Sequence, residues 1–224
     1  MAKVFIGIPS VRDYQPFINS MAKFIPLVQK EHEVKIAQIK AQMVDKARNT
    51  IVDKFLESGM DYLLFLDDDH EGHTIEMFNA LLNSNVLFSS IKSHTRFFPY
   101  SINLLDYSGH SEEKIKYKMK EETEGVHECD LIGFGMALIK KELFNIISPP
   151  YFVAKDNRKE DNYFCDLLLS KGIKPVGIFD YCLSHQGIDS IKAKALKEEG
   201  LDQIFKSLEE RFPGKQLKEL KIIA

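Results

Sequence analysis

The sequence predicts an α/β protein, in which a mostly parallel sheet lies between two layers of helices and a helical tail follows. Two observations predict this class. Short apolar runs, which suit strands buried on both faces, alternate with segments of helical periodicity over the first two-thirds of the chain. The length of 224 residues also fits one α/β domain of generous size with an extension.

The expected strands are apolar runs that stop at turn residues or charges, at residues 4–8, 62–66, 86–91 and 175–179, with an alternating segment at 33–39. The expected helices repeat their apolar residues every three or four positions, at residues 16–29, 45–58, 74–82, 140–147 and 161–170. Gly59 and Gly172 are helix-ending glycines, and Thr74 is a suitable N-cap. Residues 93–111 are expected to form a loop or short strands, and residues 114–124 an exposed hairpin edge or a helix.

The last part of the chain differs in composition from the rest. It is rich in Lys, Glu and Leu, and Pro213–Gly214 divides it into two helical pieces. We therefore expect an α/β domain over residues 1–189 and a C-terminal helical extension over residues 190–224. Such an extension is suited to packing on the domain, to pairing two copies in a homo-oligomer or to docking a partner.

The composition is that of an ordinary globular protein, with 44% hydrophobic and 28% charged residues. A net charge of −3 disfavours a protein that grips nucleic acid in bulk. The N-terminal apolar run is too short for a signal peptide, and no run approaches the roughly 18 to 20 apolar residues of a membrane span, so a cytoplasmic protein is expected. The cysteines Cys129, Cys165 and Cys182 are expected to be small buried hydrophobes, because their spacing suits neither disulfides nor a metal knuckle.

The expected strand at residues 62–66 runs directly into three aspartates, Asp67, Asp68 and Asp69. Neighbouring carboxylates at the end of a buried strand repel each other and are partly desolvated, which raises their pKa and costs stability. A divalent cation such as Mg²⁺ or Mn²⁺ removes this cost and can also chelate the phosphates of a nucleotide. In an extended segment Asp67 and Asp69 point to one side and Asp68 to the other, so Asp67 and Asp69 are the predicted ligands.

Three other interpretations of this segment stay open. The aspartates can cap the next helix or be solvated in a loop. Together with His70 and His73 they can hold zinc or iron for hydrolysis, although we expect His70 to stay outside the ligand set. A strand that ends in Asp-x-Asp is also typical of haloacid-dehalogenase phosphatases, but those have Thr or Val where this chain has Glu71.

Five segments, in the same order along the chain, resemble glycosyltransferases of the GT-A fold, especially the family-2-like group of bacteria and phages. Leu64-Phe65-Leu66-Asp67-Asp68-Asp69-His70 resembles their DxD segment. The others are Phe5-Ile6-Gly7-Ile8-Pro9, Ala47-Arg48-Asn49, Gly133-Phe134-Gly135-Met136 with Ile139 and Phe144, and Glu160-Asp161 with Phe164 and Cys165. The resemblance covers about residues 3 to 188 and implies a Rossmann-like GT-A domain.

The resemblance also implies an activity, namely metal-dependent, hexosyltransferase-like transfer of a sugar from a UDP- or GDP-sugar to a hydroxyl acceptor, with inversion by analogy. Mn²⁺ or Mg²⁺ would be held by Asp67, Asp69 and His185. Asp161 would be the general base, with Glu160 as the neighbour able to exchange roles with it. The donor would be contacted by Pro9, Arg48, Asn49, Asp67, Asp68, Gly133 and Gly135.

Each of these roles has a plain structural alternative. Arg48 and Asn49 can belong to a solvated helix face, and Asp161 can be an acid favoured at a helix N-terminus. Asp130 is a weaker candidate for the base. A loop with Lys92, His94, Arg96 and Tyr100 is suited to an acceptor groove or a lid, whereas a nucleic-acid acceptor is disfavoured. For the whole chain, the alternative function is a non-catalytic protein of the same fold that binds a nucleotide-sugar or a metal.

Overall fold

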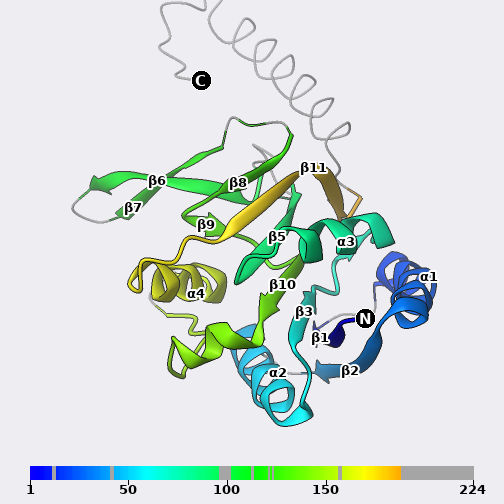
Figure 1. Ribbon diagram of the computed structural model, residues 1–224. Coiled ribbons are helices and arrows are strands. Elements are labelled where there is room, and N and C mark those ends of the chain that lie inside the picture. Colours follow the sequence, from blue (N-terminus) through cyan, green and yellow to red (C-terminus); the bar gives the residue numbers. More distant parts are fainter. Residues whose placement is uncertain are drawn as a thin grey trace, which may run out of the picture.

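The computed structural model describes residues 1–11, 14–40, 43–95, 102–111, 114–120, 122, 124–155 and 158–187. The extension predicted at 190–224, with its proposed role in oligomers, lies outside these residues, as do Arg96 and Tyr100. The described chain folds around an eight-stranded sheet in the order β2-β1-β3-β10-β5-β11-β4, with β8 also paired to β11 (Figure 1).

The sheet is mostly parallel, as the sequence predicts. The strands that share one direction are β1 (Lys3–Ser10), β2 (Glu33–Lys40), β3 (Tyr62–Leu66), β5 (Phe88–Ser93) and β11 (Val176–His185). The strands that run against them are β4 (His70–Glu71), β8 (Val126–Glu128) and β10 (Met136–Lys140). Because β10 lies between β3 and β5 in the middle of the sheet, the parallel strands form two separate groups.

Helices cover both faces of the sheet, which confirms the predicted three-layer arrangement (Figure 1). On one face α1 (Gln15–Glu31) and α3 (Ile75–Asn83) pack on Ile6 and Leu64. On the other face α2 (Val44–Ser58), α4 (Glu160–Leu169) and the 3-10 helix η1 (Lys141–Asn145) pack on Phe5 and Leu63. Neighbouring residues of a strand point to opposite faces, so fully apolar strands fill both cores.

Gly7 shows how closely one helix approaches the sheet. A Cβ at Gly7 would lie 2.3 Å from Cγ2 of Ile51, which belongs to α2. The absence of a side chain in the middle of β1 therefore lets α2 pack directly on the strand.

A smaller three-stranded sheet, in the order β7-β6-β9, extends from the main body. It consists of β6 (Leu104–Ser111), β7 (Lys114–Met119) and β9 (Leu131–Ile132), and β6 and β7 pair as an antiparallel hairpin. For residues 114–124 the sequence predicts either an exposed hairpin edge or a helix, and the structure confirms the hairpin. Residues 104–111 form a full strand, where the sequence predicts a loop or short strands.

Two other elements differ from their predictions. The segment at residues 140–147 forms a 3-10 helix over Lys141–Asn145. The last strand is longer than predicted and ends at His185, so this histidine belongs to β11 rather than to a following loop. Two of the three cysteines, Cys129 and Cys165, are buried as expected, whereas Cys182 is half-buried.

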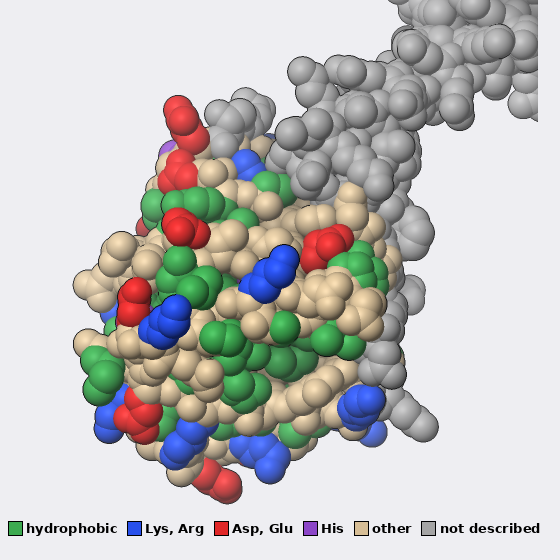
Figure 2. Space-filling model, turned by 90° about the vertical axis from the view of Figure 1, so that its right-hand side faces the viewer, with side chains coloured by type: hydrophobic (Ala, Val, Ile, Leu, Met, Phe, Trp, Pro, Cys, Tyr) green, Lys and Arg blue, Asp and Glu red, His purple; other side chains and the backbone are tan. Residues whose placement is uncertain are grey.

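The side of the molecule on which α1 and β2 lie carries lysines and acidic residues scattered among exposed apolar side chains (Figure 2). Exposed apolar residues on these two elements are Ile18, Leu27 and Ile36. No single sign of charge dominates this face, in agreement with the small net charge of the chain. Among the described residues, no helix is long and apolar enough to cross a membrane.

Candidate functional site

The carboxyl ends of β1, β3, β5 and β11 surround a cavity of about 480 Å³. Ligands commonly bind at this edge of a parallel sheet, because the strand ends and the loops that follow them converge there. All the residues predicted to bind the metal or the donor, except Asn49, line the cavity together with the two predicted catalytic carboxylates: Pro9, Arg48, Asp67, Asp68, Asp69, Gly133, Gly135, Glu160, Asp161 and His185. His70, Ser93, His94, Asn103 and Lys159 also line it.

The three aspartates lie in a turn, whereas the ligand prediction assumed an extended strand. β3 ends at Leu66, and the backbone N–H of His70 donates a hydrogen bond of 3.2 Å to the carbonyl of Asp67. Side-chain alternation holds only in extended backbone, so it does not govern Asp67, Asp68 and Asp69. The extended backbone assumed for the pairing of Asp67 with Asp69 is therefore wrong, and the pairing itself stays a prediction.

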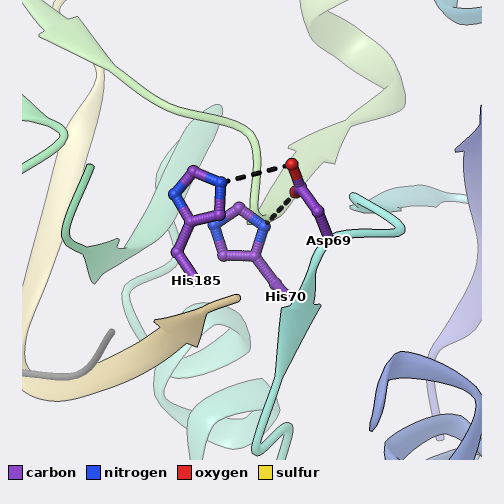
Figure 3. Close-up of side chains that lie close together, drawn as sticks. All are labelled: Asp69, His70 and His185. Carbon is purple, nitrogen blue, oxygen red and sulfur yellow. Dashed lines mark hydrogen bonds and ion pairs between the residues drawn. The ribbon is translucent and has the colours of Figure 1, made fainter. Parts of the chain in front are cut away.

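The turn brings together Asp69, His70 and His185 (Figure 3). Backbone pairing of β4 with β11 sets His70 opposite His185, and the two imidazole rings stack with their centroids 4.2 Å apart. Nδ1 of His70 lies 2.9 Å from Oδ1 of Asp69, and Nε2 of His185 lies 3.2 Å from Oδ2. One ligand atom from each of the three residues lies within 4.8 Å of the others. His70, which we expected to stay outside the ligand set, thus belongs to the group whose geometry could hold a metal ion.

The hydrogen bonds behind these side chains suit a bound cation. Nδ1 of His185 lies 2.9 Å from the carbonyl oxygen of His94, an acceptor only, so Nδ1 carries the proton. In a neutral imidazole Nε2 then presents a lone pair, and it does so toward the carboxylate of Asp69. Two acceptors that face each other need a proton or a metal ion between them, and two imidazoles favour a transition metal such as Mn²⁺ over Mg²⁺.

The ionised form of Asp69 also suits a metal ligand. Burial alone would raise the pKa of Asp69, but the contacts with His185 and His70 outweigh burial and hold that pKa well below its ordinary value. Burial lowers the pKa of His70, which favours its neutral form. A carboxylate and neutral imidazoles are the forms that bind metal ions.

Asp67 has a different partner from Asp69. Its Oδ1 and Oδ2 lie 2.9 and 3.1 Å from Nη2 of Arg48, and Nε of Arg48 donates to Oε1 of Glu160 at 3.3 Å. The predicted metal ligand Asp67 is therefore engaged in an ion pair. It does not belong to the metal-competent group, by which we mean Asp69, His70 and His185. Burial raises the pKa of Asp67, while the guanidinium of Arg48 opposes that shift.

Arg48 is buried, with only 2% of its surface exposed, so the alternative of a solvated helix face is wrong for this residue. Its guanidinium carbon lies 4.6 Å from the ring centre of Phe134 and 5.2 Å from that of Phe65. Aromatic rings on its faces and carboxylates at its edge hold the guanidinium in one orientation. Arg48 thus forms a rigid cationic part of the cavity wall.

Two other predicted donor contacts have well-defined positions. Oδ2 of Asp68 accepts a hydrogen bond of 2.7 Å from the backbone N–H of Val11, just beyond β1, so Asp68 joins the loops after β1 and β3. Asn49 lies outside the cavity lining. Its amide donates to the carbonyl of Phe152 at 2.7 Å and accepts from the backbone N–H of Tyr151 at 3.0 Å. In this structure Asn49 attaches the segment at Tyr151 and Phe152 to α2.

The predicted catalytic carboxylates begin α4 at the rim of the cavity. Glu160 is paired with Arg48, whereas Oδ1 of Asp161 accepts a hydrogen bond of 2.8 Å from the N–H of Asn162. Burial raises the pKa of Asp161. Asp130, the weaker candidate for the base, lies outside the cavity lining and pairs with Lys174 at 3.0 Å.

The two glycines of the Gly133-Phe134-Gly135 segment each make room for a side chain. A Cβ at Gly135 would lie 2.6 Å from Nε2 of His70, and a Cβ at Gly133 would lie 2.6 Å from Nδ2 of Asn103. Their small size therefore serves the packing of His70 and Asn103 in the cavity wall.

Ser93 and Asn103 are two of the wall residues that sequence reasoning missed. The Ser93 hydroxyl lies 3.3 Å from Nε2 of His70, and Asn103 is hydrogen-bonded to the backbone of Ser93. The only signal in the sequence is a polar residue at the end of an apolar run, which is too common to identify a site. Of the predicted acceptor loop, His94 lines the cavity, and Lys92 donates to the carbonyl of Phe179 at 2.7 Å.

Comparisons with known proteins agree with this architecture at the level of the fold. No family model matches the chain, and no curated protein matches it. Among solved structures, A197 from STIV is similar over 82% of this chain and 85% of that chain, with a TM-score of 0.56 and 20% identity. GalNAc-T7, solved with UDP, GalNAc and Mn²⁺, is similar over 82% of this chain but only 44% of that chain, with a TM-score of 0.52 and 10% identity. The chain therefore has a GT-A-like, glycosyltransferase-like fold.

Proposed function

We propose that the protein is a metal-dependent glycosyltransferase that moves a sugar from a nucleotide-diphosphate donor to a hydroxyl acceptor. The observation that carries the proposal is a single cavity on a glycosyltransferase-like fold that contains both a metal-competent group and a separate carboxylate. The group is Asp69, His70 and His185, and the carboxylate is Asp161. Binding alone requires the first, whereas transfer also requires the second.

The metal ligands of the proposal are Asp69, His70 and His185, with Mn²⁺ preferred over Mg²⁺ because two of the ligands are imidazoles. When bound, the ion would supply positive charge to the diphosphate that leaves during transfer. Asp67 is assigned to the donor pocket together with Arg48, since these two side chains already neutralise each other. Pro9, Asp68, Gly133 and Gly135 complete the proposed donor contacts, and Glu160 holds Arg48 from the other side.

Asp161 is the proposed general base. Its carboxylate takes the proton from the acceptor hydroxyl while the acceptor oxygen bonds to the anomeric carbon of the donor sugar. The bond between that carbon and the diphosphate oxygen breaks, and the electron pair leaves with the diphosphate. A direct displacement of this kind inverts the anomeric centre. The raised pKa of Asp161 suits the role, because a base works best when its pKa is near the working pH.

Calorimetry tests the binding half of the proposal. UDP, GDP, UDP-glucose, UDP-N-acetylgalactosamine and GDP-mannose are titrated into the full chain with and without Mn²⁺. We expect one nucleotide series to bind, and to bind more tightly when Mn²⁺ is present. The proposal fails if no nucleotide diphosphate binds in either condition.

The variant Asp161→Asn tests the catalytic half. It should retain the donor affinity of the wild type while transfer, or hydrolysis of the donor in the absence of an acceptor, is lost. Asp130→Asn is the matched control, because Asp130 is a carboxylate outside the cavity. If Asp161→Asn turns over like the wild type, Asp161 is not the base. If the wild type binds donors but releases no sugar with any acceptor or with water, the protein is a binding protein.

A further inference from the structure

Two consecutive residues at the end of β5 contact the two stacked imidazoles of the metal-competent group. The Ser93 hydroxyl lies 3.3 Å from Nε2 of His70. The carbonyl oxygen of His94, the next residue along the chain, lies 2.9 Å from Nδ1 of His185. The end of β5 therefore contacts both rings, and it does so at opposite ring nitrogens.

Ser93 is held in place well enough to direct its hydroxyl. Its backbone pairs with Leu183 of β11. Its N–H donates to Oδ1 of Asn103 at 2.7 Å, and its carbonyl accepts from the N–H of Asn103 at 2.9 Å. Only 2% of its surface is exposed. Because a serine hydroxyl can both donate and accept, it can serve Nε2 of His70 with or without a proton on that nitrogen.

These contacts leave a different nitrogen facing Asp69 in each ring. In His185 the contact with the carbonyl of His94 occupies Nδ1, so Nε2 faces Oδ2 of Asp69 at 3.2 Å. In His70 the contact with Ser93 occupies Nε2, so Nδ1 faces Oδ1 of Asp69 at 2.9 Å (Figure 3). This Nδ1 is buried and has no hydrogen-bond partner among the described residues, although it lies in contact range of the carboxylate. A cation between the ring and the carboxylate would use that lone pair.

We propose that His70 binds the metal ion through Nδ1 and His185 through Nε2, and that the Ser93 hydroxyl is the positioning group that selects Nδ1 of His70. The inference rests on the metal site of the proposed function and adds which nitrogen each ring uses. A neutral imidazole that binds a cation through Nδ1 carries its proton on Nε2, and the Ser93 hydroxyl accepts that proton in a hydrogen bond.

The hydroxyl matters more to the metal-bound form than to the metal-free form. A bound cation draws charge from the ring, so the Nε2–H of His70 becomes a stronger donor. Without the Ser93 hydroxyl this donor would be left buried and without a partner, which is destabilising. Removal of the hydroxyl should therefore weaken metal binding, as the loss of a group that orients a ligand commonly does.

Nitrogen-15 NMR of the full chain tests which nitrogens bind. Zn²⁺ replaces Mn²⁺ as the probe, because Zn²⁺ is diamagnetic and accepts imidazole and carboxylate ligands. The spectra of His70→Gln and His185→Gln assign the two rings, whose signals are then followed during a Zn²⁺ titration of the wild type. We expect the Zn²⁺-bound protein to carry the ring proton on Nε2 of His70 and on Nδ1 of His185. Coordination of either ring through the other nitrogen overturns the inference.

The variant Ser93→Ala tests the positioning role, and Ser89→Ala is its matched control. Ser89 is a buried serine of the same strand that does not line the cavity, and its hydroxyl lies 3.4 Å from that of Ser84. Titration of Mn²⁺ followed by electron paramagnetic resonance should show affinity about tenfold lower in Ser93→Ala and unchanged in Ser89→Ala. Unchanged affinity in Ser93→Ala, or equal losses in the two variants, overturns the role of Ser93.

The NMR measurement needs only the wild type to bind, so it decides the nitrogen assignment even if Ser93→Ala does not fold. A wild type that binds Mn²⁺ and nucleotide but coordinates through other nitrogens overturns this inference alone. A wild type that binds neither Mn²⁺ nor Zn²⁺ overturns the metal site of the proposed function as well.

Discussion

His70 and His73 stand three positions apart in the sequence but have different surroundings in the fold. His70 meets Asp69 and stacks on His185 at the cavity. Nδ1 of His73 lies 3.0 Å from the hydroxyl of Ser20 on α1, and its ring packs beside Phe17 and Phe24. The pairing of the two histidines in a hydrolase site, an alternative open from the sequence, does not form in this arrangement.

The two histidines are therefore expected to differ in metal binding. His70→Gln should weaken Mn²⁺ binding by more than about tenfold, because an imidazole ligand is lost. His73→Gln should leave the Mn²⁺ affinity unchanged, since His73 faces α1. Titration of Mn²⁺ followed by electron paramagnetic resonance measures both affinities. Equal losses in the two variants would contradict the assignment and revive the site with both histidines.

His73 also predicts a dependence of stability on pH. Burial lowers its pKa from 6.5 to about 3, so protons bind more readily to the unfolded chain. The contribution of neutral His73 is thus complete above pH 6.5 and is lost as the pH falls from 6.5 toward 3. The maximum slope for one group is about 1.4 kcal/mol per pH unit.

Urea unfolding of the wild type and His73→Gln at a series of pH values measures this effect. The wild type should lose more unfolding free energy than the variant between about pH 6 and pH 4, because only the wild type takes up the additional proton. Parallel curves for the two proteins would show that His73 does not titrate in this way.

At the scale of elements, the metal-competent group depends on how β3, β4 and β11 are joined. The turn after β3 leads into β4, and the pairing of β4 with β11 brings His185 across from His70, although more than a hundred residues separate them in the chain. Gly135, just before β10, borders the same place. The site is therefore assembled from strand ends that are rigid parts of the sheet.

Gly135→Ala and Gly133→Ala form a matched pair that tests this assembly. A Cβ at Gly135 would lie 2.6 Å from the His70 ring, so we expect this variant to displace His70 and to lower Mn²⁺ affinity by about tenfold. The Cβ at Gly133 meets Asn103 instead, and Mn²⁺ affinity should be retained. Unchanged Mn²⁺ affinity in Gly135→Ala, measured on protein shown to be folded by circular dichroism, would argue against His70 as a ligand.

At the scale of the whole molecule, two apolar cores enclose the sheet from opposite faces. One contains the buried residues of α1 and α3, and the other those of α2, α4 and η1. All the described residues of both cores lie before residue 189. This is the region in which the sequence predicts an independent domain.

A chain that ends at residue 189 is accordingly expected to fold and to keep its site. Its melting temperature and Mn²⁺ affinity should match those of the full chain, because all described core and cavity residues are retained. Thermal unfolding and calorimetry compare the two proteins. A large fall in melting temperature, or binding of a dye that reports exposed apolar surface, would show that residues 190–224 belong to the domain.

Much of the fold can be predicted from the sequence because strand burial is a local signal. The run Tyr62–Leu66 is apolar at every position since both faces of β3 are covered, and the helical spacing of α2 and α4 reports the face that packs on the sheet. The hairpin of β6 and β7 could not be chosen over a helix, because the two strands pair in a small sheet that is separate from the main sheet. The 3-10 helix η1 has only five residues, which is too short for a clear pattern of apolar residues in the sequence.

The chemistry of the site was predictable as a set of residues but not as a set of partners. Asp69, Asp161 and His185 meet in one cavity as the sequence led us to expect, because the ends of parallel strands converge at one edge. The turn at Asp67 and the register of β4 against β11 decide which aspartate meets Arg48 and which meets the two histidines. A shift of one residue in a strand reverses the side to which every side chain points, and sequence alone does not specify that register.

The sequence by itself therefore determined the three-layer α/β architecture and the acidic cluster at the end of β3. Both follow from burial and charge, which act on each segment separately. Only the tertiary structure decided that Asp67 pairs with Arg48 and that His70 lies beside Asp69 and His185. Those relations join residues from different strands and helices, and contacts between distant segments exist only once the chain has folded.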